Sequence, residues 1–80
     1  MNAQQKQSAA RMKARAIREH TGKGFLTLTE VAAELGYKDW RTAKRWLAGK
    51  KVPSMPNGRH PVYDVDALAS AIVRDEFSGM

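Results

Sequence analysis

The chain has 80 residues, no cysteine, 14 basic and 8 acidic side chains, and a formal net charge of +6. This length predicts one small domain that buries roughly 60% of its unfolded surface. The lack of cysteine excludes disulfides and a cysteine-ligated metal. No apolar run approaches the ~20 residues that a membrane helix needs. The excess of positive charge favours an anionic partner, and nucleic acid is the commonest one for a small basic domain.

Residues 1–24 are expected to form a basic N-terminal arm or a frayed helix. Residues 1–20 carry five basic side chains and one acidic one. Their composition favours helix, but their only large apolar residues are Met12 and Ile17, which we expect to be too few for a packed stripe. The segment is open to three interpretations: an arm that follows DNA, a helix that binds a partner, or a disordered tail.

The sequence from Phe25 onward predicts a short extended piece followed by a helix. Thr27 and Glu30 have the spacing of a capping box, in which a hydroxyl is followed three residues later by a carboxylate. The helix is expected over Leu28–Leu35, and Gly36 then fits a left-handed helix end.

A second helix is expected from Trp40 to about Ala48, with Asp39 as its N-cap and Gly49 at its end. One face is apolar, through Ala43, Trp46 and Leu47, and we expect Trp46 in the core. The other face is polar and basic, and it consists of Arg41, Thr42, Lys44 and Arg45. Two short helices joined by a few residues that include a glycine are typical of a helix-turn-helix.

The remainder predicts a small hairpin and a last helix. Val52 and Val62–Tyr63 flank a segment with three prolines and an Asn57-Gly58 turn, where glycine accepts positive φ. Asp64 is expected to cap a helix from Val65 to about Phe77. Its expected buried side consists of Val65, Leu68, Ile72 and Phe77. The predicted fold is α+β, mostly helical: a winged helix-turn-helix over residues 25–80.

The stretch from Leu26 to about Val73, "LTLTEVAAELGYKDWRTAKRWLAGKKVP" followed by "NGRHPVYDVDALASAI", resembles the excisionase-like, MerR-type winged helix proteins of phages and integrative elements. The resemblance rests on the Leu-Thr opening, the Glu-x-Ala-Ala helix, the glycine turn, the polar helix ending in Trp-Leu, the Lys-x-Pro strand and the Gly-Arg wing. Two features depart from that family's pattern. Trp40 stands where a small polar residue is usual, and the wing carries extra prolines.

The resemblance implies sequence-specific binding to double-stranded DNA, with the second helix in the major groove and the wing in the minor groove. The alternative is that this basic face is an ordinary solvent-exposed helix surface with no ligand. Trp40 is either a lid packed on the wing or an exposed aromatic ring that contacts DNA. The residues expected to contact DNA are Trp40, Arg41, Thr42, Lys44, Arg45, Lys50, Lys51, Asn57, Arg59 and His60.

The resemblance also implies a recombination directionality factor that bends attachment-site DNA and promotes excision by a site-specific integrase in the cytoplasm of a bacterial host. A small transcriptional regulator with the same domain and a basic protein-interaction module remain alternatives. Residues 64–80 carry one basic and four acidic side chains, so head-to-tail self-association on DNA is a further hypothesis. No nucleophile–base pair, carboxylate dyad or phosphate-binding glycine loop is visible. We therefore expect no enzyme activity, no cofactor and no metal.

Overall fold

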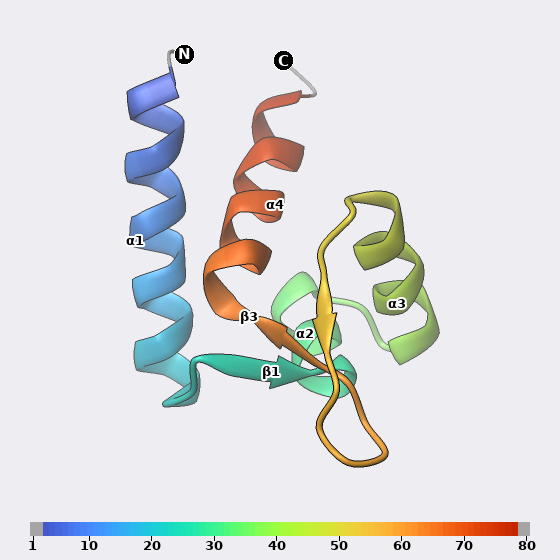
Figure 1. The fold of residues 1–80 in the computed structure, drawn as a ribbon. Coiled ribbons are helices and arrows are strands. Elements are labelled where there is room, and N and C mark those ends of the chain that lie inside the picture. Colours follow the sequence, from blue (N-terminus) through green and yellow to red (C-terminus); the bar gives the residue numbers. More distant parts are fainter. Residues whose placement is uncertain (1–2, 79–80) are drawn as a thin grey trace.

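The computed structural model describes residues 3–78, which form four helices and a three-stranded antiparallel sheet (Figure 1). In chain order the elements are α1 (Ala3–Thr21), β1 (Phe25–Thr27), α2 (Leu28–Leu35), α3 (Trp40–Gly49), β2 (Ser54–Met55), β3 (Val62–Asp64) and α4 (Val65–Ser78). The predicted class, α+β and mostly helical, is confirmed. Residues 1–2 and 79–80, which belong to the predicted segments, lie outside the described residues, as does the side chain of Phe77.

The sheet has the strand order β1-β3-β2, so the strand nearest the C-terminus lies in the centre. Its inner face is buried through Leu26 and Tyr63, which are paired in register. The predicted hairpin is β2 and β3, with Met55 opposite Val62. The sequence placed Val52 in the first strand, but β2 begins only at Ser54. Val52 lies before it and is buried. The pairing of β1 with β3 was not predicted.

The ends of α2, α3 and α4 carry the caps that the sequence indicates. Thr27 and Glu30 form both halves of the capping box, since each backbone N–H donates to the other residue's side chain. Gly36 ends α2 with a φ of 79°. Asp39 accepts a hydrogen bond from the backbone of α3, and Asp64 does the same for α4. These local bonds satisfy helix-end groups that would otherwise lack partners.

The end of α3 differs from the expectation. Gly49 remains helical, and Lys51 takes the left-handed conformation instead, with a φ of 58°. The Val52 N–H donates to the Leu47 carbonyl, and the Lys51 N–H donates to that of Ala48. These two bonds form a Schellman motif, whose left-handed position is usually glycine because a Cβ is unfavourable there. The backbone is therefore strained at Lys51.

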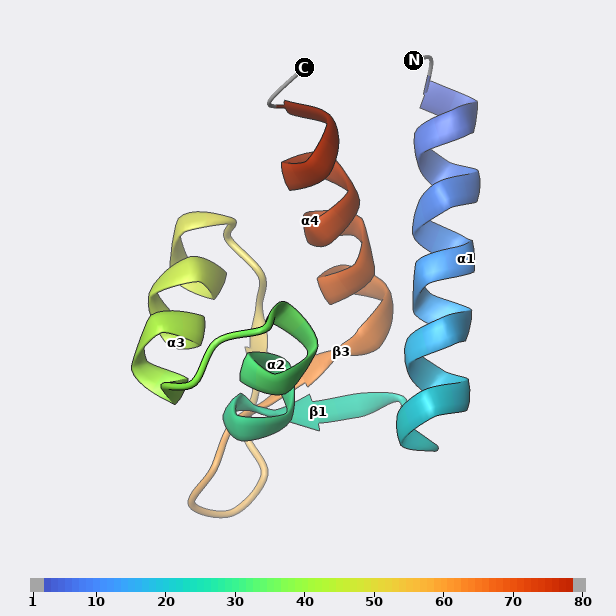
Figure 2. The same cartoon turned by 180° about the vertical axis from the view of Figure 1, so that it is seen from behind.

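Helix α1 packs lengthwise against α4, as Figures 1 and 2 both show. Ala14 and Ile17 are each only 2% exposed and belong to the same buried cluster as Leu68 and Ala71 of α4. The expectation that this segment is too poor in apolar residues to pack is therefore wrong. Alanine lets two helix backbones approach closely, so a single isoleucine and small neighbours suffice for a contact.

The arrangement places α1 and α3 at opposite sides of the molecule, with α4 between them (Figures 1 and 2). The β2–β3 loop projects at the end away from the start of α1 and the end of α4. This loop and α3 are consequently available on the side that α1 does not cover.

Candidate nucleic-acid interface

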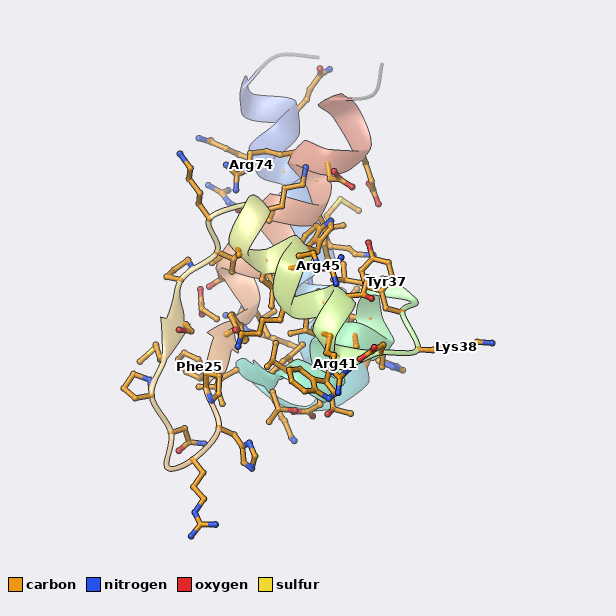
Figure 3. The ribbon with its side chains drawn as sticks, turned by 90° about the vertical axis from the view of Figure 1, so that its right-hand side faces the viewer. Phe25, Tyr37, Lys38, Arg41, Arg45 and Arg74 are labelled. Carbon is orange, nitrogen blue, oxygen red and sulfur yellow. The ribbon has the colours of Figure 1, made fainter. Side chains whose placement is uncertain are left out.

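Helix α3 is held by its apolar side and presents its basic side outward. Ala43 and Leu47 are buried, and Trp46 is partly buried against the same core. Arg41 and Arg45 lie on the outer side of α3 (Figure 3). Together with Thr42 and Lys44 they are exposed and form what we call the basic face of α3. The amphipathic pattern in the sequence therefore orients this helix as expected.

The positive charges of this face are not compensated within the described part of the chain. The ion pairs found there are Arg15–Glu19, Arg18–Asp66, His20–Glu34, Lys23–Glu30 and Lys50–Asp75. None of them involves a residue of the basic face. Asp39, the nearest acidic residue in sequence, uses its carboxylate to cap α3. A surface with one uncompensated sign of charge attracts oppositely charged ligands.

Lys50 and Lys51 differ although they are neighbours. The Lys50 ammonium lies 2.6 Å from a carboxylate oxygen of Asp75 and ties the end of α3 to α4. Lys51 is exposed and takes part in none of the ion pairs of the described residues. Of the two predicted contacts, Lys51 is thus the better placed to meet an external anion.

The tip of the β2–β3 loop carries the other predicted contacts. Gly58 has a φ of 65°, and the His60 N–H donates to the Asn57 carbonyl at 3.3 Å, which closes a tight turn. Asn57, Arg59 and His60 are all exposed. The turn therefore presents an arginine at the far end of a short two-stranded support.

A hollow lies between the start of α3 and the β2–β3 loop. It has a volume of about 470 Å³ and is lined by Thr27, Leu28, Thr29, Trp40, His60 and Pro61. We call it the Trp40 hollow. Trp40 is 46% exposed, and the Arg41 guanidinium carbon lies 5.7 Å from the centroid of its ring, within the range of a cation–π contact. Trp40 is thus both exposed and next to the β2–β3 loop.

The hollow brings together two predicted residues, Trp40 and His60, that are 20 positions apart in sequence. It also includes Thr29, which the sequence pattern did not single out, because the capping box consists only of Thr27 and Glu30. Lys38, also missed, is exposed just before the cap of α3. In the sequence, the feature that could have indicated Lys38 is its position next to Asp39 in a basic stretch.

The perturbed carboxylates belong to the scaffold and not to the basic face. Hydrogen bonds from Lys23 and from the Thr27 backbone lower the pKa of Glu30. The Arg18 guanidinium donates to both oxygens of Asp66, at 3.0 and 2.8 Å, and lowers the pKa of that carboxyl. The same bonds raise the pKa of Arg18, and burial raises that of Tyr63. Opposite charge and hydrogen bonding favour the ionised carboxylate in each case.

Residues 3–78 hold no group of three or more histidine or acidic side chains placed to bind a metal ion. Among the same residues, no helix is both long and apolar enough to cross a bilayer. Compared with protein-family models, curated proteins and solved structures, the chain matches none of them.

Proposed function

We propose that the chain is a sequence-specific, double-stranded DNA-binding protein with a winged helix-turn-helix fold. The observation that carries this proposal is the basic face of α3. It is exposed and takes part in none of the ion pairs of residues 3–78, and Ala43 and Leu47 pack its helix against the core. In this interpretation α2 and α3 are the helix-turn-helix, and the β2–β3 loop is the wing.

The dimensions agree with docking of α3 in the major groove. An α-helix with its side chains is about 10–12 Å across, and the major groove of B-DNA is about 12 Å wide. Arg41, Lys44 and Arg45 lie on one side of the helix at positions i, i+3 and i+4. Arginine can read guanine through two parallel hydrogen bonds, whereas lysine more simply neutralises phosphate.

The wing supplies a second contact. The minor groove has a negative potential that attracts arginine, and Arg59 stands at an exposed turn with no ion pair within the described residues. We propose that it enters the minor groove next to the segment that α3 reads, while Lys51 contacts phosphate.

We further propose an architectural role of the excisionase type, in which the protein binds and bends attachment-site DNA to favour excision by an integrase. This step rests on the resemblance of Leu26–Val73 to that family. A small transcriptional regulator is the alternative and would use the same face. Head-to-tail assembly on DNA would use the acidic C-terminal segment of one copy to contact the basic surface of the next. Less negative charge is available for this contact than the sequence suggested, since Asp66 and Asp75 already pair with Arg18 and Lys50.

The deciding experiment is a DNase I footprint on the DNA flanking the gene, at physiological salt and with competitor DNA. Protection over repeated sites at an attachment site is the expected result. A single protected operator at a promoter would favour the regulator. Binding that disappears with competitor and salt would refute specific DNA recognition, since attraction to phosphate alone has that behaviour.

A further inference from the structure

We propose that the Trp40 hollow binds the sugar–phosphate backbone of one DNA strand, with the indole packed against a deoxyribose. The inference rests on the proposed DNA-binding function and assigns a contact between its two groove-binding elements. It decides between the two interpretations of Trp40 that the sequence leaves open.

The first argument is the position of the hollow. One wall is the start of α3, and the opposite wall is His60–Pro61 on the limb of the hairpin that returns from the wing tip. If α3 lies in the major groove and the wing in the adjacent minor groove, the backbone of one strand separates them. The surface that joins the two elements is therefore the surface which that backbone meets.

The second argument is the chemistry of the walls. Leu28, Trp40 and Pro61 offer carbon surface, which suits the C–H groups of a deoxyribose. Thr29 and His60 add hydrogen-bonding groups to the lining, and Arg41 brings a positive charge next to the indole. This combination of apolar surface with cationic and hydrogen-bonding groups is complementary to a sugar flanked by phosphates.

The third argument is that the ring remains uncovered beside open space. The Arg41 guanidinium carbon lies 5.7 Å from the ring centroid, and 46% of the residue remains exposed. If the Trp40 indole were a lid packed on the wing, it would fill the space between α3 and the wing. Instead, a volume of about 470 Å³ remains open beside the ring. That volume lies in the roughly 300–1,000 Å³ range of sites that enclose small organic groups.

The test uses the full chain and a duplex selected by that chain from a randomised library. In Trp40→Ala we expect about tenfold weaker binding, since loss of roughly 50 Å² of buried apolar contact corresponds to a factor of that size. Trp40→Phe keeps an aromatic face and should lose much less. No charge is removed, so the dependence of affinity on salt should be unchanged, whereas Arg41→Gln should reduce that slope by about one.

Hydroxyl-radical footprinting locates the contact, because the radical attacks exposed deoxyriboses. Trp40→Ala should restore cleavage at one or two nucleotides between the major-groove and minor-groove contacts and leave the other protections unchanged. Met12→Ala is the matched control, since Met12 is an exposed apolar residue on α1, 73% exposed and remote from the hollow. It should alter neither affinity nor cleavage.

Fluorescence gives an independent readout. In Trp46→Phe, Trp40 is the sole tryptophan, and its emission should change when the selected duplex is added. Full affinity and an unchanged cleavage pattern in Trp40→Ala, with wild-type footprints intact, would overturn this inference and leave the proposed function standing. Failure of the wild-type chain to select any duplex would overturn both.

Discussion

At the scale of single residues, Lys51 shows a conflict between stability and binding. It occupies the left-handed position of the Schellman motif at the end of α3, where glycine carries no steric penalty. Strained backbone positions cluster where a ligand is held. Its exposed side chain is also one of the charges that we place on phosphate. The two effects can be distinguished because the strain acts on stability and the charge acts on DNA binding.

Lys51→Gly should raise the free energy of unfolding by about 1 kcal/mol, because glycine relieves the left-handed strain. It should also weaken DNA binding and reduce the salt dependence of that binding by about one ion. Urea denaturation and titration with DNA at several salt concentrations measure the two effects.

Lys50→Gly is the matched control for this change. Lys50 has a φ of −89° and pairs with Asp75, so glycine there relieves no strain and removes an ion pair. Its stability should fall. A gain in stability at Lys50 as large as that at Lys51 would contradict the explanation by backbone strain.

Arg45 tests the basic face directly. Arg45→Gln should cost about 1–3 kcal/mol of specific binding, roughly 5- to 150-fold in Kd, if its guanidinium reads a base. Arg15→Gln, on the opposite side of the molecule, removes the same charge from an exposed residue of α1. Gel-shift titration of both variants on specific and random duplexes is the measurement. Equal losses in the two variants would indicate general attraction of charge and no reading by α3.

At the scale of elements, the short helices are defined by their caps and the long ones by contact with each other. Helix α2 has only eight residues, and an isolated helix of that length is unstable in water. Its capping box and its left-handed glycine end set its limits. Helix α1 instead depends on α4, where Ala14 and Ile17 are buried.

Ile17→Ala should therefore destabilise the whole protein by about 2–5 kcal/mol, as truncation of a buried aliphatic side chain usually does. The expected observation is one cooperative thermal transition at a lower Tm, together with loss of helical circular dichroism. If α1 were only a loosely attached arm, the Tm of Ile17→Ala would match that of the wild type, and Met12→Ala would be indistinguishable from it.

At the scale of the whole molecule, acidic groups hold elements together, while the basic face of α3 and Arg59 of the β2–β3 loop take part in none of the ion pairs of the described residues. Asp66 joins α4 to α1 through Arg18, Asp75 joins α4 to α3 through Lys50, and Glu30 joins α2 to Lys23. The basic face of α3, Lys51 and Arg59 thus form a positive surface on the side that α1 does not cover, while α1 carries five further basic side chains and one acidic one. Such an arrangement favours association with a polyanion.

The Arg18–Asp66 pair predicts how stability depends on pH. In the folded protein the pKa of the Asp66 carboxyl is lowered from about 3.9, its value in an unfolded chain. The stabilisation by this ion pair is therefore fully present above about pH 3.9, and it is lost as the pH falls through the folded pKa. Asp66→Asn should lower the urea midpoint slightly at pH 7, and the difference from wild type should shrink as the pH falls below 4.

Glu19→Gln provides the comparison, because it removes a more exposed pair within α1. It should change stability less at neutral pH, since exposed pairs are screened by water. A difference between wild type and Asp66→Asn that persisted unchanged at low pH would show that the ion pair is not its cause.

Much of this protein was determined locally by its sequence. Thr27 with Glu30, Gly36, Asp39 and Asp64 set the helix ends through bonds between near neighbours, and such bonds can be predicted from spacing alone. The period of Ala43 and Leu47 likewise predicted which side of α3 faces the core and which carries its charges.

Only the tertiary structure decided which distant segments meet. It placed α1 on α4, paired β1 with β3, engaged Lys50 with Asp75 and brought Trp40 beside His60. Each of these contacts depends on segments that many residues of chain separate, and their side chains carry no signal of the partner they will meet. The two small alanine-rich helix faces could pack because their close approach buries enough surface, which a count of large apolar residues in one segment does not reveal.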